Sequence, residues 1–273
     1  MDILKKIKNR YRYSLVLLRQ LVITDFKLRY QGSVLGYVWS LLRPLFLFVI
    51  LYMVFVKFMR IGADVPHFPV YLLMGIVLWN FFAEITSQSV TAIVDRGDLI
   101  RKLNFPKYVI IVSTAFSALI NLALNIVVIA VFMFLNHVDF TWNVLWTPLL
   151  VLEIFIFSMS LGFILSAIFV KLRDINYIWE VILQALFYAT PIIYPLSMVV
   201  DRWPGVAKLM LLNPIAQAIQ DIRHLAITPK AETLGSLVNH GYIAYVPYAI
   251  VVIMLVFAIV LFKKMSPHFA EEV

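Results

Sequence analysis

The chain has 273 residues, of which 63% are hydrophobic and 14% charged, and its net charge is +8. Soluble domains average roughly 45–50% apolar and about 25% charged residues, so a water-soluble fold would lack the polar surface to cover its core. The sequence contains no cysteine, which excludes a disulfide framework and a thiolate metal site.

An amphipathic helix over residues 13–30 is expected to lie in the membrane interface before the first span. At helical spacing, four apolar side chains share one face, namely those of Leu15, Leu18, Val22 and Phe26. Gly32 and Gly36 follow, and they favour a break between this helix and the first span. The alternative is that residues 13–30 form the cytoplasmic start of one long, tilted span.

Six apolar stretches are long enough to cross a bilayer, because a helix rises about 1.5 Å per residue and the hydrocarbon core is about 30 Å thick. They are residues 34–56, 70–94, 108–135, 144–170, 175–200 and 242–262. We therefore expect an all-α integral membrane protein with six transmembrane helices, organised as a single domain over residues 1–273.

Lysine and arginine predict how these spans are oriented. Seventeen of the 23 Lys and Arg residues fall on the side that the two termini share, and six fall on the opposite side. Because cytoplasmic loops carry an excess of these cations, both termini are predicted to be cytoplasmic. Orientation and attraction to anionic lipid headgroups explain the positive charge better than nucleic-acid binding does.

Residues 201–241, before the last span, hold apolar pieces of half the length that a span needs. The two pieces are residues 206–212 and 214–222, and they are interrupted by Pro204, Gly205, Asn213 and Pro214. We expect re-entrant or interfacial half-helices, which membranes tolerate where the backbone is buried in protein or lines a wet cavity. The alternative is a solvated outer loop.

The sequence contains few motifs that indicate catalysis or the binding of nucleotide or metal. It has no G-x-x-x-x-G-K-[ST] phosphate-binding loop, and no two histidines lie one helical turn apart, so neither nucleotide binding nor a metal site is expected in this chain. Three carboxylates, Glu84, Glu153 and Glu180, fall in different spans and form no evident acid–base pair. Each remains a functional hypothesis, because an ionised group in hydrocarbon costs about 2.5–3.5 kcal/mol or more.

Polar or aromatic residues follow one face of the first five spans except the fourth. The first-span stripe is Tyr37, Phe48, Tyr52 and Phe55, and the fifth-span stripe is Tyr177, Glu180, Gln184 and Tyr188, continued by Pro191 and Pro195. The second span has Asn80, Glu84, Ser87 and Thr91, and the third has Thr114, Ser117, Asn121 and Asn125. The sixth span has no such stripe and is expected to be peripheral, facing lipid.

Two interpretations of the stripes remain open. Small polar residues most often hold membrane helices together, and this interpretation is favoured for the second and third spans. The first and fifth stripes pair aromatic rings with carboxylate and amide groups. Ring faces contact sugar C–H surfaces and amides bond sugar hydroxyls, so these stripes are candidates for a polysaccharide path.

Several segments resemble permease subunits of ATP-binding-cassette polysaccharide exporters. The N-terminal signature is matched by Asp25-Phe26-Lys27-Leu28-Arg29-Tyr30, by Ser33 to Ser40 and by Arg43-Pro44. Further matches, in the family's order, are Leu99 to Lys102 with Phe105-Pro106, Arg173 to Ile175 with Pro191 to Pro195, and Leu212-Asn213-Pro214. The chain departs from the family at Arg43, where an asparagine is common.

The resemblance implies a homodimer of six-span subunits in the cytoplasmic (inner) membrane, paired with two cytoplasmic ATPase subunits that bind ATP and Mg²⁺. Its cargo would be a lipid-linked polysaccharide, either O-antigen-like or teichoic-acid-like, and this chain would carry no cofactor or catalytic residue. Residues 95–107 would form a coupling helix that contacts the ATPase through Asp98, Leu99, Ile100, Arg101, Lys102 and Leu103. Residues 201–241 would form an outer gate, and Pro191, Pro195, Asn213 and Pro214 are the residues expected to take part in it.

Two other classes compete with this interpretation. A membrane-embedded glycosyl or phosphoglycosyl transferase would need clustered acid, base or metal ligands near one interface, and the sequence shows none. A proton-coupled secondary transporter would use the intramembrane glutamates and would need no ATPase. The sequence leaves the identity of the polysaccharide and the type of cell envelope open.

Overall fold

The computed structural model describes residues 14–25, 27, 33, 36–62, 64–103, 105–238 and 241–272. Within these residues every regular element is a helix, and five helical stretches are long and apolar enough to cross a membrane. They are Trp39–Phe58, Phe68–Asp95, Tyr108–Leu135, Trp142–Lys171 and Tyr242–Glu272. The chain is thus an all-helical, multi-pass membrane protein, which confirms the class predicted from composition.

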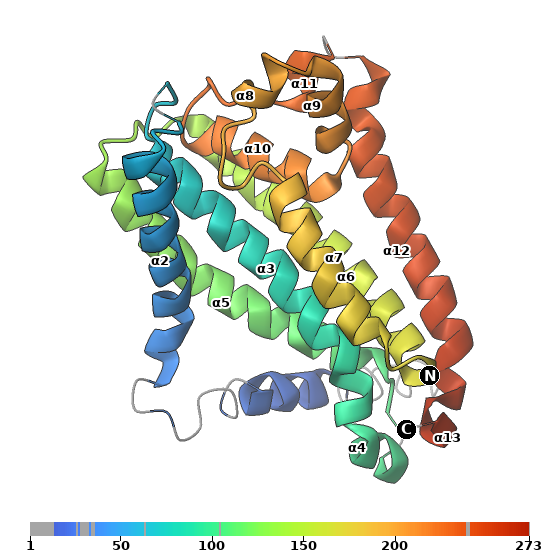
Figure 1. The fold of residues 1–273 in the computed structure, drawn as a ribbon. Coiled ribbons are helices and arrows are strands. Elements are labelled where there is room, and N and C mark those ends of the chain that lie inside the picture. The colour runs from blue at the N-terminus through green and yellow to red at the C-terminus, as the bar shows by residue number, and fades with distance from the viewer. Residues whose placement is uncertain are drawn as a thin grey trace.

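The helices follow one another along the chain as drawn in Figure 1. The first half contains η1 (Gly36–Val38), α2 (Trp39–Leu51), the π-helical η2 (Tyr52–Phe58), α3 (Phe68–Asp95), α4 (Gly97–Lys102) and α5 (Tyr108–Leu135). The second half contains η3 (Trp142–Trp146), α6 (Thr147–Lys171), α7 (Ile175–Ala189), α8 (Ser197–Val200), α9 (Pro204–Leu211), α10 (Pro214–Ala226), α11 (Leu234–Leu237), η4 (Tyr242–Tyr245), α12 (Val246–Met265), η5 (Ser266–His268) and α13 (Phe269–Glu272).

Helix α3 forms the centre of the bundle, with α5 and α6 packed along it and α2, α7 and α10 in contact with parts of its length. Its side chains at Val70, Leu72, Ile76 and Ile85 have no exposed surface. A helix that is apolar on all sides is expected where neighbouring helices surround it. By contrast, α12 buries one face against α6 and α10 and exposes Val252, Ile253 and Val256, so the prediction of a peripheral last span is confirmed.

The fifth predicted span, residues 175–200, is not one continuous helix, and this corrects the sequence prediction. Helix α7 ends at Ala189, and Thr190 is extended, with φ −93° and ψ 136°. Proline disfavours the helical conformation of the residue before it, so Pro191 ends α7 at this point. With 15 residues at about 1.5 Å each, α7 is about 22 Å long and falls short of a hydrocarbon core of about 30 Å.

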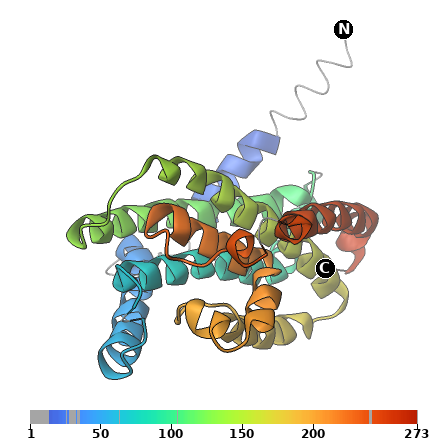
Figure 2. The same cartoon turned by 90° about the horizontal axis from the view of Figure 1, so that it is seen from above.

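The predicted half-length pieces of residues 201–241 form short helices at one end of the bundle. Asn213 separates α9 from α10, and its Oδ1 accepts a hydrogen bond from the Ile215 backbone N–H at 3.1 Å. Pro214 takes the first helical position, where the missing N–H costs nothing. Helices α8, α9, α10 and α11 lie together at the top of Figure 1, and Figure 2 looks down on this end of the molecule.

The other end of the bundle holds α4, α13 and the helical segment 14–25. Figure 1 shows this segment running across the long axis of the bundle, near α4. Helix α13 contacts α4, and the two share an apolar cluster that includes Ile100, Phe105, Phe262 and Phe269. Parts of the predicted interfacial helix and of the first span, residues 13, 26, 28–30 and 34–35, lie outside the described residues.

Candidate transport path and coupling region

The fifth-span stripe lies on an uncovered face of α7. Tyr177 and Tyr188 are 70% and 65% exposed, and Glu180 and Gln184 between them are exposed as well. Glu180 accepts a hydrogen bond from the Asn176 side chain at 3.0 Å. The structure therefore brings these four predicted path residues together on one surface with two phenol rings, a carboxylate and an amide.

The opposite face of α7 packs on the bundle. Trp179 is buried edge-on against Phe82 of α3, with ring centroids 6.3 Å apart. Phe187 flanks the stripe, seven residues after Glu180, and is half-buried: its ring contacts Trp79 of α3 at 5.8 Å and Tyr188 of the stripe at 5.3 Å. Trp179 and Phe187 thus make the ring contacts between this helix and α3.

The first-span stripe does not form one surface. Phe48 is only 5% exposed, and its ring packs edge-on against Phe132 of α5 at 5.5 Å, as helix packing would require. Tyr52 and Phe55 are half-buried, while the side chain of Tyr37 lies outside the described residues. A path role remains open for Tyr52 and Phe55, whose rings are partly accessible.

The stripes of the second and third spans meet at a polar cavity of about 430 Å³ between α2, α3 and α5. Glu84 lines this cavity, and its Oε1 accepts hydrogen bonds from Asn121 Nδ2 at 2.7 Å and from Gln88 Nε2 at 3.3 Å. The other polar side chains that line the cavity are Ser40, Arg43, Asn80, Ser87 and Asn125.

The stripes of the second and third spans thus do two things. Nearer the α4 end, Thr114 of the third-span stripe holds α5 to α3, since it shares a hydrogen bond at 3.1 Å with Ser89, which lies outside the second-span stripe. Further along, the two stripes enclose polar space around Glu84, which explains how an intramembrane carboxylate is tolerated there. Arg43, where this chain departs from the resembling family, lines the same cavity.

The break after α7 is held by a fully buried arginine, Arg223 of α10. Its guanidinium donates to the backbone carbonyls of Pro191 (2.6 Å) and Ile192 (2.8 Å). It also donates to the Tyr71 carbonyl at 3.0 Å and lies over the Tyr71 ring, 3.7 Å from its centroid. Arg223 therefore joins three elements, namely α3, α10 and the turn that follows α7.

Of the predicted gate positions, Pro191 and Pro195 lie buried in this turn, while Asn213 and Pro214 begin α10. Arg223 itself was not among the predicted site residues. The sequence offered no clear signal, because Arg223 lies just beyond the apolar piece 214–222 and close to the charged or polar residues Asp221 and His224. Its backbone partners come from distant parts of the chain and carry no pattern of their own.

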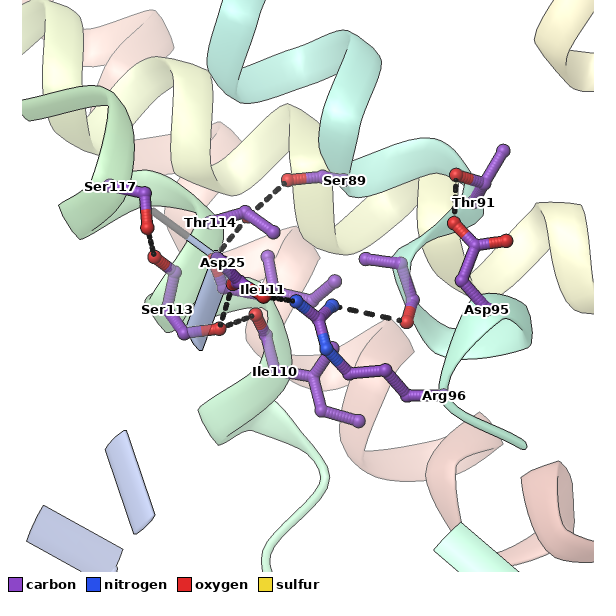
Figure 3. Close-up of polar contacts among 11 residues, drawn as sticks. Asp25, Ser89, Thr91, Asp95, Arg96, Ile110, Ile111, Ser113, Thr114 and Ser117 are labelled. Atoms are coloured by element: carbon purple, nitrogen blue, oxygen red, sulfur yellow. Dashed lines mark hydrogen bonds and ion pairs between the residues drawn. The ribbon is translucent and has the colours of Figure 1, made fainter. Parts of the chain in front are cut away.

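The coupling region is organised by an ion pair at the junction of α3 and α4. Arg96 contacts Asp25 of the helical segment 14–25, and both side chains are largely shielded from solvent. Figure 3 shows the Arg96 guanidinium directed toward Asp25. The guanidinium also donates to the Ala92 carbonyl at 3.4 Å. Ser113 of α5 lies 3.5 Å from the same carboxylate. The segment, α3 and α5 thus meet at Asp25.

Helix α4 presents a mixed surface. Asp98, Arg101, Lys102 and Leu103 are exposed, and Leu99 is half-buried. Ile100 is instead buried in the cluster with Phe269. Of the predicted coupling residues, all but Ile100 therefore remain accessible to a partner, while Ile100 anchors α4 to its own chain.

Lys107 fixes the other end of this loop. Its Nζ donates to the Ser266 carbonyl at 2.6 Å, which links the start of α5 to the end of α12. Burial lowers the pKa of the Lys107 ammonium, and the nearby Glu271 carboxylate opposes this shift. The loop is thus anchored at both ends, by Arg96 and by Lys107.

Comparison with known proteins places these features in context. The sequence profile of ABC-2 type transporters matches residues 16–226. The O-antigen export system permease protein RfbA of Myxococcus xanthus is 31% identical over 274 residues, covering 99% of this chain and 100% of the relative. The protein of the same name from Klebsiella pneumoniae is 28% identical over 267 residues, covering 97% and 98%.

Proposed function

The chain belongs to the ABC-2 type transporter family and is the membrane subunit of an exporter powered by ATP-binding-cassette subunits, and from this premise we propose that its cargo is a lipid-linked polysaccharide, O-antigen-like or teichoic-acid-like. The names of the relatives support this cargo class, because both are O-antigen export system permease proteins and both match this chain over nearly their whole length. ATP and Mg²⁺ are bound by two separate ATPase subunits, because this chain has no phosphate-binding loop.

The exposed stripe on α7 carries the proposal. A carboxylate, an amide and two phenols on a membrane helix are costly in lipid, where an ionised glutamate alone costs about 2.5–3.5 kcal/mol at the bilayer centre. The face is therefore covered by a second copy of the chain, or it lines a wet path. The face is shielded from lipid and also lines a wet path if two copies pair as a homodimer with their α7 faces around one conduit.

Aromatic rings beside hydrogen-bonding groups suit a polysaccharide. Tyr177 and Tyr188 offer ring faces for sugar C–H surfaces, and Glu180 and Gln184 between them accept or donate hydrogen bonds to hydroxyls. Such contacts are individually weak and repeat along a polymer, so the polysaccharide can slide along the α7 face. Tyr52 and Phe55 of the first span are proposed as the opposite wall.

The topology follows from the same proposal. Helix α7 and the turn after it complete a sixth crossing, and α9 and α10 are re-entrant half-helices that form an outer gate with Pro191, Pro195, Asn213 and Pro214. Both termini, the interfacial segment and α4 then lie on the cytoplasmic side of the inner membrane. There α4 presents Leu99, Leu103 and its cations to the ATPase.

Single cysteines test the path, since the chain has none of its own. Tyr177→Cys, Gln184→Cys and Tyr188→Cys, in the exporter assembled with its ATPase, should react with a water-soluble thiol reagent, and ATP should alter the rates. Phe187→Cys is the matched control, because Phe187 neighbours the stripe on the same helix but is half-buried against Trp79 of α3. Equal protection at all four positions in every nucleotide state would refute the conduit.

A further inference from the structure

A second cavity, of about 710 Å³, lies between α6, α10 and α12, away from the α7 stripe. Its lining includes strongly exposed apolar and aromatic side chains on η3, η4 and the two spanning helices, namely Trp146, Leu149, Leu152, Tyr245 and Val252. Side chains of this kind on a membrane helix face lipid. The cavity therefore opens toward the hydrocarbon of the bilayer and not toward the proposed conduit.

The inner wall of this cavity presents hydrogen-bond acceptors that lack donors. Glu153 of α6 is only 8% exposed, and neither of its carboxylate oxygens has a hydrogen-bond partner among the described residues. Gln217 of α10 is 1% exposed and its Oε1 has no described partner either. Its Nε2 is already used, donating to Asp221 Oδ2 and to Tyr248 Oη at 3.0 Å.

These orphan atoms define the chemistry of an occupant. Buried acceptors without donors are unfavourable, and more so where the group is charged. Two carboxylates, Glu153 and Asp221, line the cavity, and the only described basic side chain in its lining is His224, whose Nδ1 lies 2.8 Å from the Ala231 carbonyl. A group that carries positive charge and several N–H donors satisfies this wall, and an apolar body suits the mouth.

We propose that the cavity binds a zwitterionic phospholipid with a primary ammonium headgroup, of the phosphatidylethanolamine type. The ammonium supplies three N–H donors to Glu153 and Gln217, and the acyl chains lie along Leu149, Leu152 and Val252. Glu153 is six residues into α6, about 9 Å from the start of that helix. Gln217 and Asp221 of α10 line the cavity beside it, so the headgroup would contact α10. The site thus ties α10 to the surrounding bilayer.

Headgroup methylation gives a direct test, because it removes donors one at a time and keeps the positive charge. The purified exporter, this chain with its ATPase, is titrated by native mass spectrometry with dioleoyl phosphatidylethanolamine, its N-methyl and N,N-dimethyl forms, and dioleoyl phosphatidylcholine. Affinity should fall along the series, by about tenfold or more from the first lipid to the last, since a hydrogen bond to a charged group is worth about 1.5–3 kcal/mol.

Matched variants assign the effect to this cavity. Glu153→Gln should abolish the preference for the primary ammonium, whereas Glu180→Gln, which changes a carboxylate outside the cavity, should preserve it. Val252→Trp narrows the mouth at an exposed position and should reduce binding of every lipid in the series. Equal affinity across the series in the unmodified protein, or an unchanged preference in Glu153→Gln, would overturn the proposal.

Discussion

Replacing Gly75 by alanine should destabilise the protein, although alanine normally favours a helix over glycine by about 1 kcal/mol. A Cβ at position 75 would lie 2.0 Å from Arg223 Nη2, 2.9 Å from its Cζ and 3.3 Å from the Ile192 carbonyl oxygen. Three backbone acceptors hold the guanidinium, so it cannot move aside without breaking hydrogen bonds. Gly75 is therefore the space into which Arg223 fits.

The magnitude follows from these contacts. Overpacking a well-packed site costs about 1–3 kcal/mol, and losing the hydrogen bond from Nη2 to Ile192 costs about 1.5–3 kcal/mol because the donor is charged. Helix propensity offsets about 1 kcal/mol of this cost, so the net loss is about 1.5–5 kcal/mol. For a chain of this size, at about 2–4 °C per kcal/mol, the apparent Tm should fall by roughly 3–20 °C.

Thermal unfolding of the purified protein measures the effect, and a double-mutant cycle assigns it. Arg223→Ala removes the clash, so Gly75→Ala should then change the apparent Tm little, and the two substitutions should be strongly non-additive. Gly205→Ala is the control, because a Cβ there meets no atom within 4 Å. A Gly75→Ala variant as stable as the unmodified protein, or one equally destabilised with and without Arg223, would refute the reasoning.

Three further outcomes are expected. Asp25→Asn should slow export more than it slows ATP hydrolysis, because it breaks the shielded ion pair with Arg96 at the start of α4. The reversed pair, Asp25→Arg with Arg96→Asp, should restore part of the export rate, and unaltered export in Asp25→Asn would contradict this role. Leu99→Asp with Leu103→Asp should leave membrane insertion intact and abolish ATPase stimulation in the assembled exporter, and normal stimulation would exclude docking through α4. Glu84→Leu should cost about 1–3 kcal/mol in unfolding free energy, since it strands two amide donors around the polar cavity, whereas an unchanged apparent Tm would show that water replaces the carboxylate.

The lengths of the uncharged stretches alone predict most of the long helices of the bundle. Tyr108–Leu135 was predicted to the residue, because the stretch follows Lys107 and carries no charged side chain over its length. The fifth span failed because hydropathy averages over Thr190 and Pro191, while the backbone restriction before a proline acts at one residue. Composition identifies what enters the membrane and says less about where a helix breaks.

The candidate site was predictable only where it lies on a single helix. The α7 stripe follows from spacing of about 100° per residue, so its residues could be grouped without tertiary information. The Glu84 cavity and the Arg223 contacts need three elements to meet, and no periodicity records that. Helix packing and the lining of a cavity use the same small polar residues, which is why packing was only the favoured interpretation for Asn121 and Asn125, both of which line a cavity.

Helix α3 also connects the two ends of the bundle as one continuous element. It carries Arg96 just beyond one end and Tyr71 and Gly75 near the other, and no proline interrupts its 28 residues after the first turn. At about 1.5 Å per residue it is about 42 Å long, so a rigid tilt of about 5° around its midpoint shifts each end by about 2 Å. Tyr71 lies about 16 Å from that midpoint, so the same tilt moves its carbonyl by about 1.4 Å. Motion of that size along the 3.0 Å bond to Arg223 would lengthen it beyond hydrogen-bonding range, so a tilt of a few degrees at the α4 end would weaken the contact at the opposite end through α3 alone.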